Sequence, residues 1–231
     1  MRNNLVKKKP ILIITKKIWA KKNYKIIPKK NFFLLKKINF TNIKKIQPKI
    51  IFFIHWSKII KKEVFNNFEC IQFHSSDLPF GKGGSPIQNQ ILMGIKNTKI
   101  SAFKINEKID DGPIIMKKKL KLTGPAQEIY INIEKIALGM IVEISKMKKL
   151  IYKKQKGKAI SFKRRTKKES EIKFHKINSI KQLYDHIRML DAKTYPKAFI
   201  KLNSFTGYLD KAKLKNGKIK SNIEFVKNDK K

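Results

Sequence analysis

Residues 50–54 read Ile-Ile-Phe-Phe-Ile, an apolar run with no polar interruption. A strand with one face in water alternates apolar and polar side chains, whereas a continuous run of β-branched and aromatic residues predicts a strand buried on both faces. A second strand is predicted at 70–75, with a short helix from Lys58 to Phe65, capped by Ser57, between the two strands. Strand, helix and strand form a βαβ unit. We therefore predict an α/β fold with a mostly parallel sheet.

The rest of the pattern divides the chain into a large domain, residues 1–152, and a small C-terminal domain, residues 160–231. Residues 123–150 carry apolar side chains at helical spacing and predict a long amphipathic helix. Further strands of the large domain are predicted at 11–14, 32–35, 98–105 and 114–122. The small domain is predicted to hold one helix and short strands, with a turn at Asn216-Gly217, and is therefore α+β or β-rich.

The net charge is +40, from 56 lysine and arginine residues against 16 aspartate and glutamate residues. Such a field attracts phosphates, so nucleic acid or an anionic substrate is an expected partner. Only four of the basic residues are arginine, the side chain best suited to bidentate recognition of phosphates. Lysine, isoleucine and asparagine are abundant throughout, as a strongly AT-biased genome would produce. Composition alone leaves open whether the charge is functional or a background on solvated faces.

Composition also indicates the cellular compartment of the protein. Hydrophobic residues make up 41% of it, enough for a substantial core, but its apolar segments are about five residues long against the roughly 20 of a membrane span. The basic N-terminus is not followed by the apolar stretch of a secretory signal. A single cysteine, Cys70, excludes an internal disulfide framework. We expect a cytoplasmic protein without membrane insertion; its oligomeric state is not predicted.

Two segments carry the candidate chemistry: residues 72–88, which combine a histidine with a Gly/Pro-rich loop, and Ile109-Asp-Asp-Gly-Pro. Because side chains alternate along a strand, Gln72 and His74 point to the same face. His74 then stands at the carboxyl end of a strand, where open α/β sheets bind ligands, and Asp110 follows it by 36 residues. No zinc-ligand spacing or phosphate-binding P-loop is present, so no metal is expected.

These residues resemble the signature of the folate-dependent formyltransferases, which include methionyl-tRNA formyltransferase and the sugar N-formyltransferases. The resemblance rests on 74–88 and 109–112, continues into 162–172, and covers roughly residues 48 to 215. Details at 52–57, 77–86 and 183–192 are most similar to the small, sugar N-formyltransferase-like branch. The resemblance implies a Rossmann-like formyltransferase domain that uses 10-formyltetrahydrofolate as cosubstrate.

The family's catalytic residues are an asparagine, a histidine and an aspartate. By resemblance the histidine corresponds to His74 and the aspartate to Asp110. The asparagine position, two residues before the histidine, holds Gln72, which offers an amide donor on a longer stem. Attack of an amine on a formyl group builds a tetrahedral oxyanion, so the reaction needs a donor at that oxygen and an acceptor for the proton of the amine. His74 is the expected donor, and Asp110 is expected to orient it and to relay the proton.

Binding residues follow from the same resemblance. The pterin of the folate is expected near two segments, which comprise Phe53, Ile54, His55, Trp56 and Ser57, and Asn106, Glu107 and Ile109. A glycine-rich loop lets backbone amides approach a ligand closely, and the loop residues expected to line the cleft are Gly81, Gly83, Gly84 and Ser85.

Structural roles compete with some of these assignments. Asp111 could replace Asp110 as the functional carboxylate, and Asp77 could simply cap the loop. His55 could contact folate or serve only as a hydrogen-bonded structural residue. The histidines of the C-terminal part, His175 and His186, are assigned to surface or packing roles.

Three hypotheses about the function remain: two differ in the amine acceptor, and the third is not an enzyme. A nucleotide-linked amino sugar is favoured by the branch resemblance and by a first strand followed too closely by Trp19 to leave room for the extra basic loop of the tRNA enzymes. Initiator methionyl-tRNA is favoured by the charge and by the C-terminal module. A nucleic-acid-binding protein with a decayed active site, marked by Gln72, is the third hypothesis.

Overall fold

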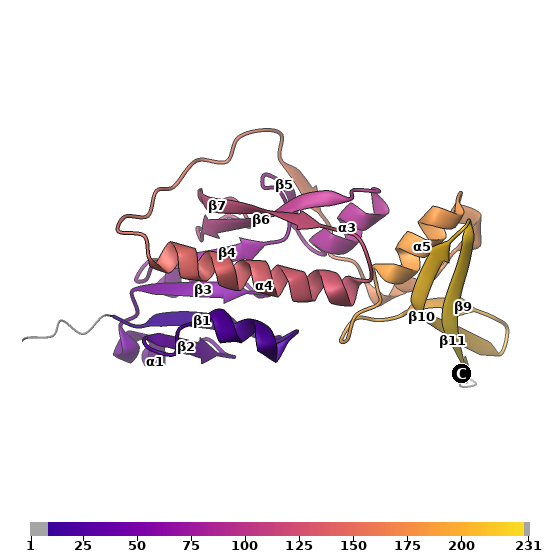
Figure 1. The fold of residues 1–231 in the computed structure, drawn as a ribbon, viewed down its shortest axis with the longest axis horizontal. Coiled ribbons are helices and arrows are strands. Elements are labelled where there is room, and N and C mark those ends of the chain that lie inside the picture. Colours follow the sequence, from indigo (N-terminus) through magenta and orange to yellow (C-terminus); the bar gives the residue numbers. More distant parts are fainter. Residues whose placement is uncertain (1–8, 229–231) are drawn as a thin grey trace, which may run out of the picture.

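The computed structural model describes residues 9–228 and centres on a six-stranded sheet (Figure 1). In spatial order its strands are β2 (Phe32–Leu35), β1 (Ile11–Thr15), β3 (Ile50–Ile54), β4 (Cys70–His74), β6 (Asn97–Lys104) and β7 (Ile114–Lys121). The first four strands are mutually parallel, whereas β6 runs antiparallel to both of its neighbours. The predicted α/β fold with a mostly parallel, Rossmann-like sheet is confirmed.

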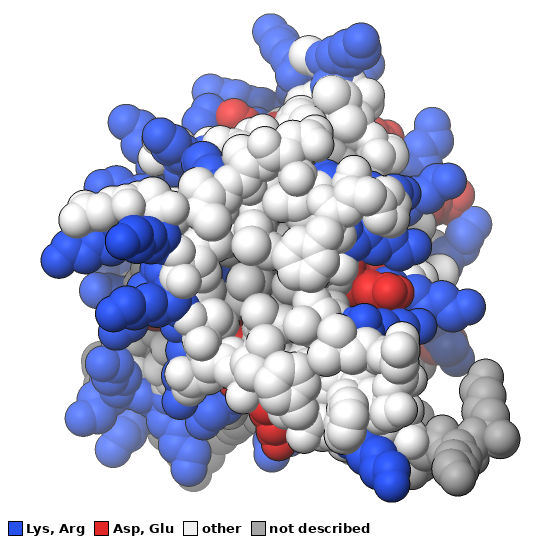
Figure 2. Space-filling model, turned by 90° about the vertical axis from the view of Figure 1, so that its right-hand side faces the viewer, with Lys and Arg blue, Asp and Glu red and all other residues white. Residues whose placement is uncertain are grey.

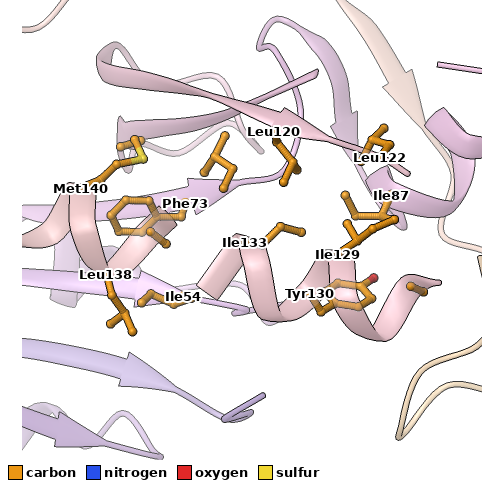
Figure 3. Packing of buried hydrophobic residues seen from close by; sticks show 14 of the residues in the cluster. Ile54, Phe73, Ile87, Leu120, Leu122, Ile129, Tyr130, Ile133, Leu138 and Met140 are labelled. Carbon is orange, nitrogen blue, oxygen red and sulfur yellow. The ribbon is translucent and has the colours of Figure 1, made fainter. Parts of the chain in front are cut away.

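Two apolar layers bury the sheet on both sides. The long helix α4 (Ala126–Ser145) packs on one face, and the short helices α1 (Phe40–Ile46) and α2 (Lys62–Phe65) pack on the other. Figure 3 shows the first layer, where Phe73 and Ile54 of the sheet lie beside Ile133 and Leu138 of α4.

The continuous apolar run of β3 is explained by these two layers. Phe52 and Ile54 belong to the cluster under α4, while Ile51 and Phe53 belong to the opposite cluster. All five side chains of β3 are at most 1% exposed, which is why the strand tolerates no polar residue.

The C-terminal module is a three-stranded antiparallel sheet of β9 (Ala198–Lys201), β10 (Phe205–Lys215) and β11 (Lys218–Lys227), packed against α5 (Ile180–Arg188). The predicted turn at Asn216-Gly217 joins β10 to β11 with positive φ at both residues, 49° and 69°. Figure 2 looks onto this end of the molecule and shows lysine and arginine side chains around an uncharged centre. The predicted C-terminal α+β module is confirmed.

Local expectations differ at two places. Ser57 does not cap a helix, because α2 begins only at Lys62 after Lys61. The predicted loop after Pro79 contains a short strand, β5 (Phe80–Gly83), which precedes helix α3 (Pro86–Leu92). The backbone of β5 pairs in parallel with β8 (Ile160–Phe162), which comes after the basic segment that follows α4.

Short 3-10 helices complete the fold: η1 (Lys21–Ile26), η2 (Lys167–Ser170) and η3 (Phe174–Lys176). The basic N-terminal segment considered in the sequence lies mostly outside the described residues. Within 9–228, no helix is both long and apolar enough to cross a membrane.

Candidate functional site

A cavity of about 820 Å³ lies where β3 and β4 end and the turn after β6 passes close to them. Its lining includes Gln72, His74 and Asp110, so the structure brings together the three residues assigned to catalysis. The histidine and the aspartate are 7% and 8% exposed, which keeps their polar atoms largely out of bulk water. The position agrees with the rule that open α/β sheets bind ligands at the carboxyl ends of their strands.

The imidazole of His74 has a partner on each side. Its Nε2 lies 2.7 Å from the backbone oxygen of Gly81, and its Nδ1 lies 3.5 Å from Oδ2 of Asp110. Because a carbonyl oxygen only accepts hydrogen bonds, Nε2 carries a hydrogen in this arrangement. The carboxylate of Asp110 faces the other nitrogen and orients the ring. The pair thus provides a positioned donor next to a carboxylate.

Asp110 is held by the glycine loop and by its own turn. The backbone N–H of Gly83 donates to Oδ2 of Asp110 at 2.8 Å. Asp110 itself has φ 51°, in the left-handed region, and a Cβ on the following Gly112 would lie 1.6 Å from the oxygen of Lys104. Only glycine can occupy that position, and the tight turn aims Asp110 at the histidine.

The neighbouring acidic residues have other partners. Asp111 pairs with Lys82, and this hydrogen bond lowers the pKa of its carboxyl group. Asp77 pairs with Lys117 at 2.5 Å and Lys99 at 2.9 Å; partial burial alone would raise its pKa, but the two hydrogen bonds outweigh that and lower it. Since neither side chain lines the cavity, the geometry favours Asp110 as the functional carboxylate.

The glycine loop lines the cavity through Gly83, Gly84 and Ser85. Gly81 does not line it, in contrast to the expectation: its carbonyl faces His74, and its Cα faces Phe162, whose ring would lie 2.7 Å from an added Cβ. A Cβ on Gly84 would similarly lie 2.4 Å from Arg164. The glycines therefore allow close approach of the β8 segment.

One flank of the cavity contains most of the expected cofactor residues. From the end of β3 and the turn after β6 it is lined by Ile54, His55, Trp56, Ser57, Asn106, Glu107 and Ile109. Phe53 is the exception: it is fully buried in the apolar cluster beneath α1 and α2, because alternation along β3 turns it away from the cavity. The assignment of Phe53 as a cavity contact is therefore corrected.

Cations surround the same flank, whose lining includes Lys58, Lys61, Lys62 and Lys108. Lys16 lies 5.3 Å from the ring centre of Trp56, and its pKa is lowered by loss of hydration and by the charge of Lys58. The indole Nε1 of Trp56 is buried without a partner in the described structure. This flank can hold a planar ring system that carries carboxylates.

His55 lies between this flank and the opposite side of the cavity, where Trp19 and Tyr130 are found. Its backbone has a left-handed conformation, φ 51°. Its ring lies 6.0 Å from both Trp19 and Tyr130, edge to face, and its Nε2 is buried with no hydrogen-bond partner among the described residues. Burial and the charge of Lys17 lower the pKa of His55 to about 3. The imidazole is therefore neutral at physiological pH.

The opposite flank was not predicted from the sequence. It is lined by Lys17, Trp19, Tyr130, Phe162, Arg164 and Tyr195. These residues come from the segment after β1, from α4, from the β8 segment and from the loop after α5, so no single motif marks them. The available signal was Tyr130, a ring with a polar tip beside the apolar stripe of α4; Figure 3 shows it among Ile129 and Ile133.

Within the described part of the chain, no three histidine, cysteine, aspartate or glutamate side chains gather as a metal site requires. His186 is buried, lies with Nε2 3.2 Å from the backbone oxygen of Ser170, and has a pKa lowered by burial. Both C-terminal histidines lie outside the cavity lining.

Comparison with known proteins gives named relatives. A methionyl-tRNA formyltransferase of Wolbachia pipientis from Culex pipiens is 25% identical over 163 residues, 68% of this chain and 52% of that protein. One from Buchnera aphidicola of Acyrthosiphon pisum is 32% identical over 114 residues, 46% of this chain and 36% of that protein. The chain thus spans about half, or less, of the length of these relatives.

Solved structures are similar over more of the chain. A methionyl-tRNA formyltransferase from Clostridium thermocellum is 42% identical, with a TM-score of 0.88 over 95% of this chain and 99% of that one. A 4-N formyltransferase from Francisella tularensis is 16% identical, with a TM-score of 0.67 over 96% of this chain and 98% of that one, and shares the fold.

Two family profiles match the chain directly. The profile described as the C-terminal domain of methionyl-tRNA formyltransferase matches residues 167–226. The profile described as formyl transferase matches residues 8–130, more than half of the 231-residue chain, and includes both members of the His74 and Asp110 pair. This chain belongs to the formyl transferase family.

Proposed function

We propose that this protein transfers a formyl group from 10-formyltetrahydrofolate to an amine. The observation that carries the proposal is the contact between His74 and Asp110 inside a cavity at the carboxyl ends of the sheet. When bound, the folate supplies a formyl carbon that is already activated for attack. The flank around Trp56 suits its planar pterin, and the surrounding lysines suit the carboxylates of its glutamate tail.

The chain's own residues then manage charge and protons. Attack by the amine places negative charge on the formyl oxygen and a surplus proton on nitrogen. His74 donates toward the oxygen through Nε2, whose hydrogen bond is exchanged from the carbonyl oxygen of Gly81 to the developing oxyanion, and Gln72, on the same face of β4, supplies a second donor there. Asp110 orients the imidazole and accepts the surplus proton directly or through it.

Methionyl-tRNA is the acceptor that the relatives favour, because the named relatives and the structure that is 42% identical carry that description. The C-terminal hairpin adds a physical argument. Lys213 lies directly opposite Lys220, and Lys215 opposite Lys218, on the paired strands β10 and β11. Like charges directly opposite one another destabilise a hairpin unless an anion neutralises them, and a phosphate backbone is such an anion.

A nucleotide-linked amino sugar is the second candidate acceptor. One observation favours it: only residues 16–20 join β1 to η1, which leaves no room for an additional basic loop there. The 4-N formyltransferase, at 16% identity, shares the fold only and does not add to this argument.

The test follows tetrahydrofolate release from 10-formyltetrahydrofolate with methionyl-tRNA and with a panel of nucleotide-linked amino sugars as acceptors. We expect turnover on methionyl-tRNA that falls by roughly 100-fold or more in His74→Ala, because a positioned donor to the oxyanion is lost. His175→Ala is the matched control, since this histidine is exposed and outside the cavity lining. Turnover on a sugar alone would favour the second candidate, and silence with every acceptor would contradict formyl transfer.

A further inference from the structure

The unpredicted flank is built around three stacked aromatic rings. The rings of Trp19 and Tyr130 are 4.6 Å apart and nearly parallel, at 7°, and those of Tyr130 and Tyr195 are 5.4 Å apart at 22°. The hydroxyl of Tyr130 donates to that of Tyr195 at 2.7 Å, which fixes the pair. Tyr130 is 7% exposed, whereas Trp19 and Tyr195 are half-buried, and all three line the cavity.

Two cations accompany the rings. The ammonium of Lys17 lies 5.4 Å from the ring centre of Trp19 and 5.1 Å from that of Tyr195, and it donates to the hydroxyl of Thr194 at 2.6 Å. Arg164 lines the same flank. Among residues 9–228, neither cation is paired with a carboxylate, although many other lysines are. This flank therefore combines aromatic surface with uncompensated positive charge.

The segment that carries Trp19 is anchored rather than loose. The carboxylate of Glu134, on α4 and fully buried, accepts from the backbone N–H groups of Trp19 at 2.8 Å and Ala20 at 2.9 Å. The side chain of Asn23 also donates to it, at 3.2 Å. The ring is thus held in place before any ligand arrives, which reduces the entropy lost on binding.

From this arrangement we infer that the flank of Trp19, Tyr130 and Tyr195, called the acceptor flank below, binds the nucleotide portion of the amine acceptor. Its base stacks on the half-buried rings, and its phosphate lies against Lys17 and Arg164. The inference rests on the proposed function and specifies which end of the cavity holds the acceptor. A base with a phosphate is common to the 3′ end of an aminoacyl-tRNA and to a nucleotide-linked amino sugar, so the site accommodates the shared chemistry of both.

The distribution of tryptophan allows a direct test. The chain contains two tryptophans. Trp19 lies on the acceptor flank, and Trp56 lies on the other flank, where the folate is proposed to bind. In Trp56→Phe, emission comes from Trp19 alone; in Trp19→Phe, it comes from Trp56 alone. Each variant is titrated with AMP, UDP, ribose 5-phosphate and tetrahydrofolate, and nucleotide binding to the unaltered chain is measured by calorimetry.

We expect AMP or UDP to quench Trp19 saturably, and ribose 5-phosphate, which lacks a base, not to do so. Adding Lys17→Ala to Trp56→Phe is expected to weaken nucleotide binding by roughly 10-fold, because a charged phosphate contact is lost. Stronger binding of AMP than of UDP would identify the tRNA end as the source, and the reverse order would identify a nucleotide-linked sugar.

Nucleotide quenching of Trp56 alone, or no nucleotide binding by calorimetry, would overturn the inference. The tetrahydrofolate titration of Trp19→Phe separates this failure from failure of the proposed function. If tetrahydrofolate quenches Trp56 while nucleotides do not bind, formyl transfer remains supported and only the nucleotide subsite is rejected. If neither ligand binds its flank, both are rejected.

Discussion

The side chain of Gln155 donates from Nε2 to the backbone oxygen of Asp110 at 2.9 Å, and the same nitrogen donates to the oxygen of Gly112, also at 2.9 Å. Gln155 lies in the basic segment between α4 and β8, which looks like a simple linker in the sequence. Its amide closes the turn that aims Asp110 at His74. The connection to the C-terminal module thus helps to hold Asp110 beside His74.

Gln155 does not line the cavity, but its replacement should impair turnover because it supports the turn that carries Asp110. In Gln155→Glu the donating nitrogen becomes an oxygen that faces two carbonyl oxygens, so the Asp110 turn opens. We expect kcat to fall by roughly 10-fold, with a smaller change in the KM for 10-formyltetrahydrofolate, since a lost hydrogen bond of this kind costs about 1–3 kcal/mol. Gln47→Glu is the matched control because this glutamine is exposed. An increase in KM with kcat unchanged would contradict a positioning role.

The sequence predicted the sheet from local patterns, and those patterns together with the family resemblance pointed to His74 and Asp110, which the structure brings together. The apolar run of β3 and the alternation in β4 are set by burial on two faces, and the turn at Asp110 is marked by its glycine. The acceptor flank and Gln155 could not be predicted in the same way. Their positions arise from tertiary contacts between segments far apart in the chain, and no periodicity records such contacts.

The buried His55 makes stability depend on pH. Its pKa is about 3 in the folded chain because of burial and the charge of Lys17, whereas an unfolded histidine titrates near 6.5. Between these values the unfolded state binds more protons than the folded state, so the free energy of unfolding falls as pH falls below about 6.5. Above that pH, His55 contributes no pH dependence.

We expect His55 to contribute about 1 kcal/mol per pH unit to the slope of the unfolding free energy against pH between pH 6 and 4.5. His55→Asn is the informative variant, because asparagine does not titrate and tolerates the left-handed conformation at this position. Its unfolding free energy, measured with urea across this pH range, should vary less steeply than that of the wild type. His175→Asn, an exposed control, should keep the wild-type slope. Equal slopes in wild type and His55→Asn would refute the assignment.

Glu134 links helix α4 to the acceptor flank. Its carboxylate accepts backbone hydrogen bonds at Trp19 and Ala20, and Glu134→Gln would place an amide hydrogen against one of these donors. We expect a loss of about 2–3 kcal/mol in the free energy of unfolding, since hydrogen bonds to a charged group are affected. The KM for the acceptor should rise more than that for the folate. Glu143→Gln, on the exposed surface of the same helix, should change stability by less than about 0.5 kcal/mol.

The opposed lysines of the C-terminal hairpin separate a functional charge from a compositional one. If Lys213 and Lys220 contact the phosphates of tRNA, the double variant Lys213→Gln/Lys220→Gln should raise the KM for methionyl-tRNA and reduce the slope of log KM against log salt by about 2. The same variant should stabilise the hairpin slightly, because a like-charged cross-strand pair is removed. Lys44→Gln/Lys45→Gln, on α1 in the large domain, carries the same change in net charge and serves as the control. Equal effects of the two double variants on the salt slope would mean that only the overall charge matters, and an unchanged KM in both would assign these lysines to the compositional background.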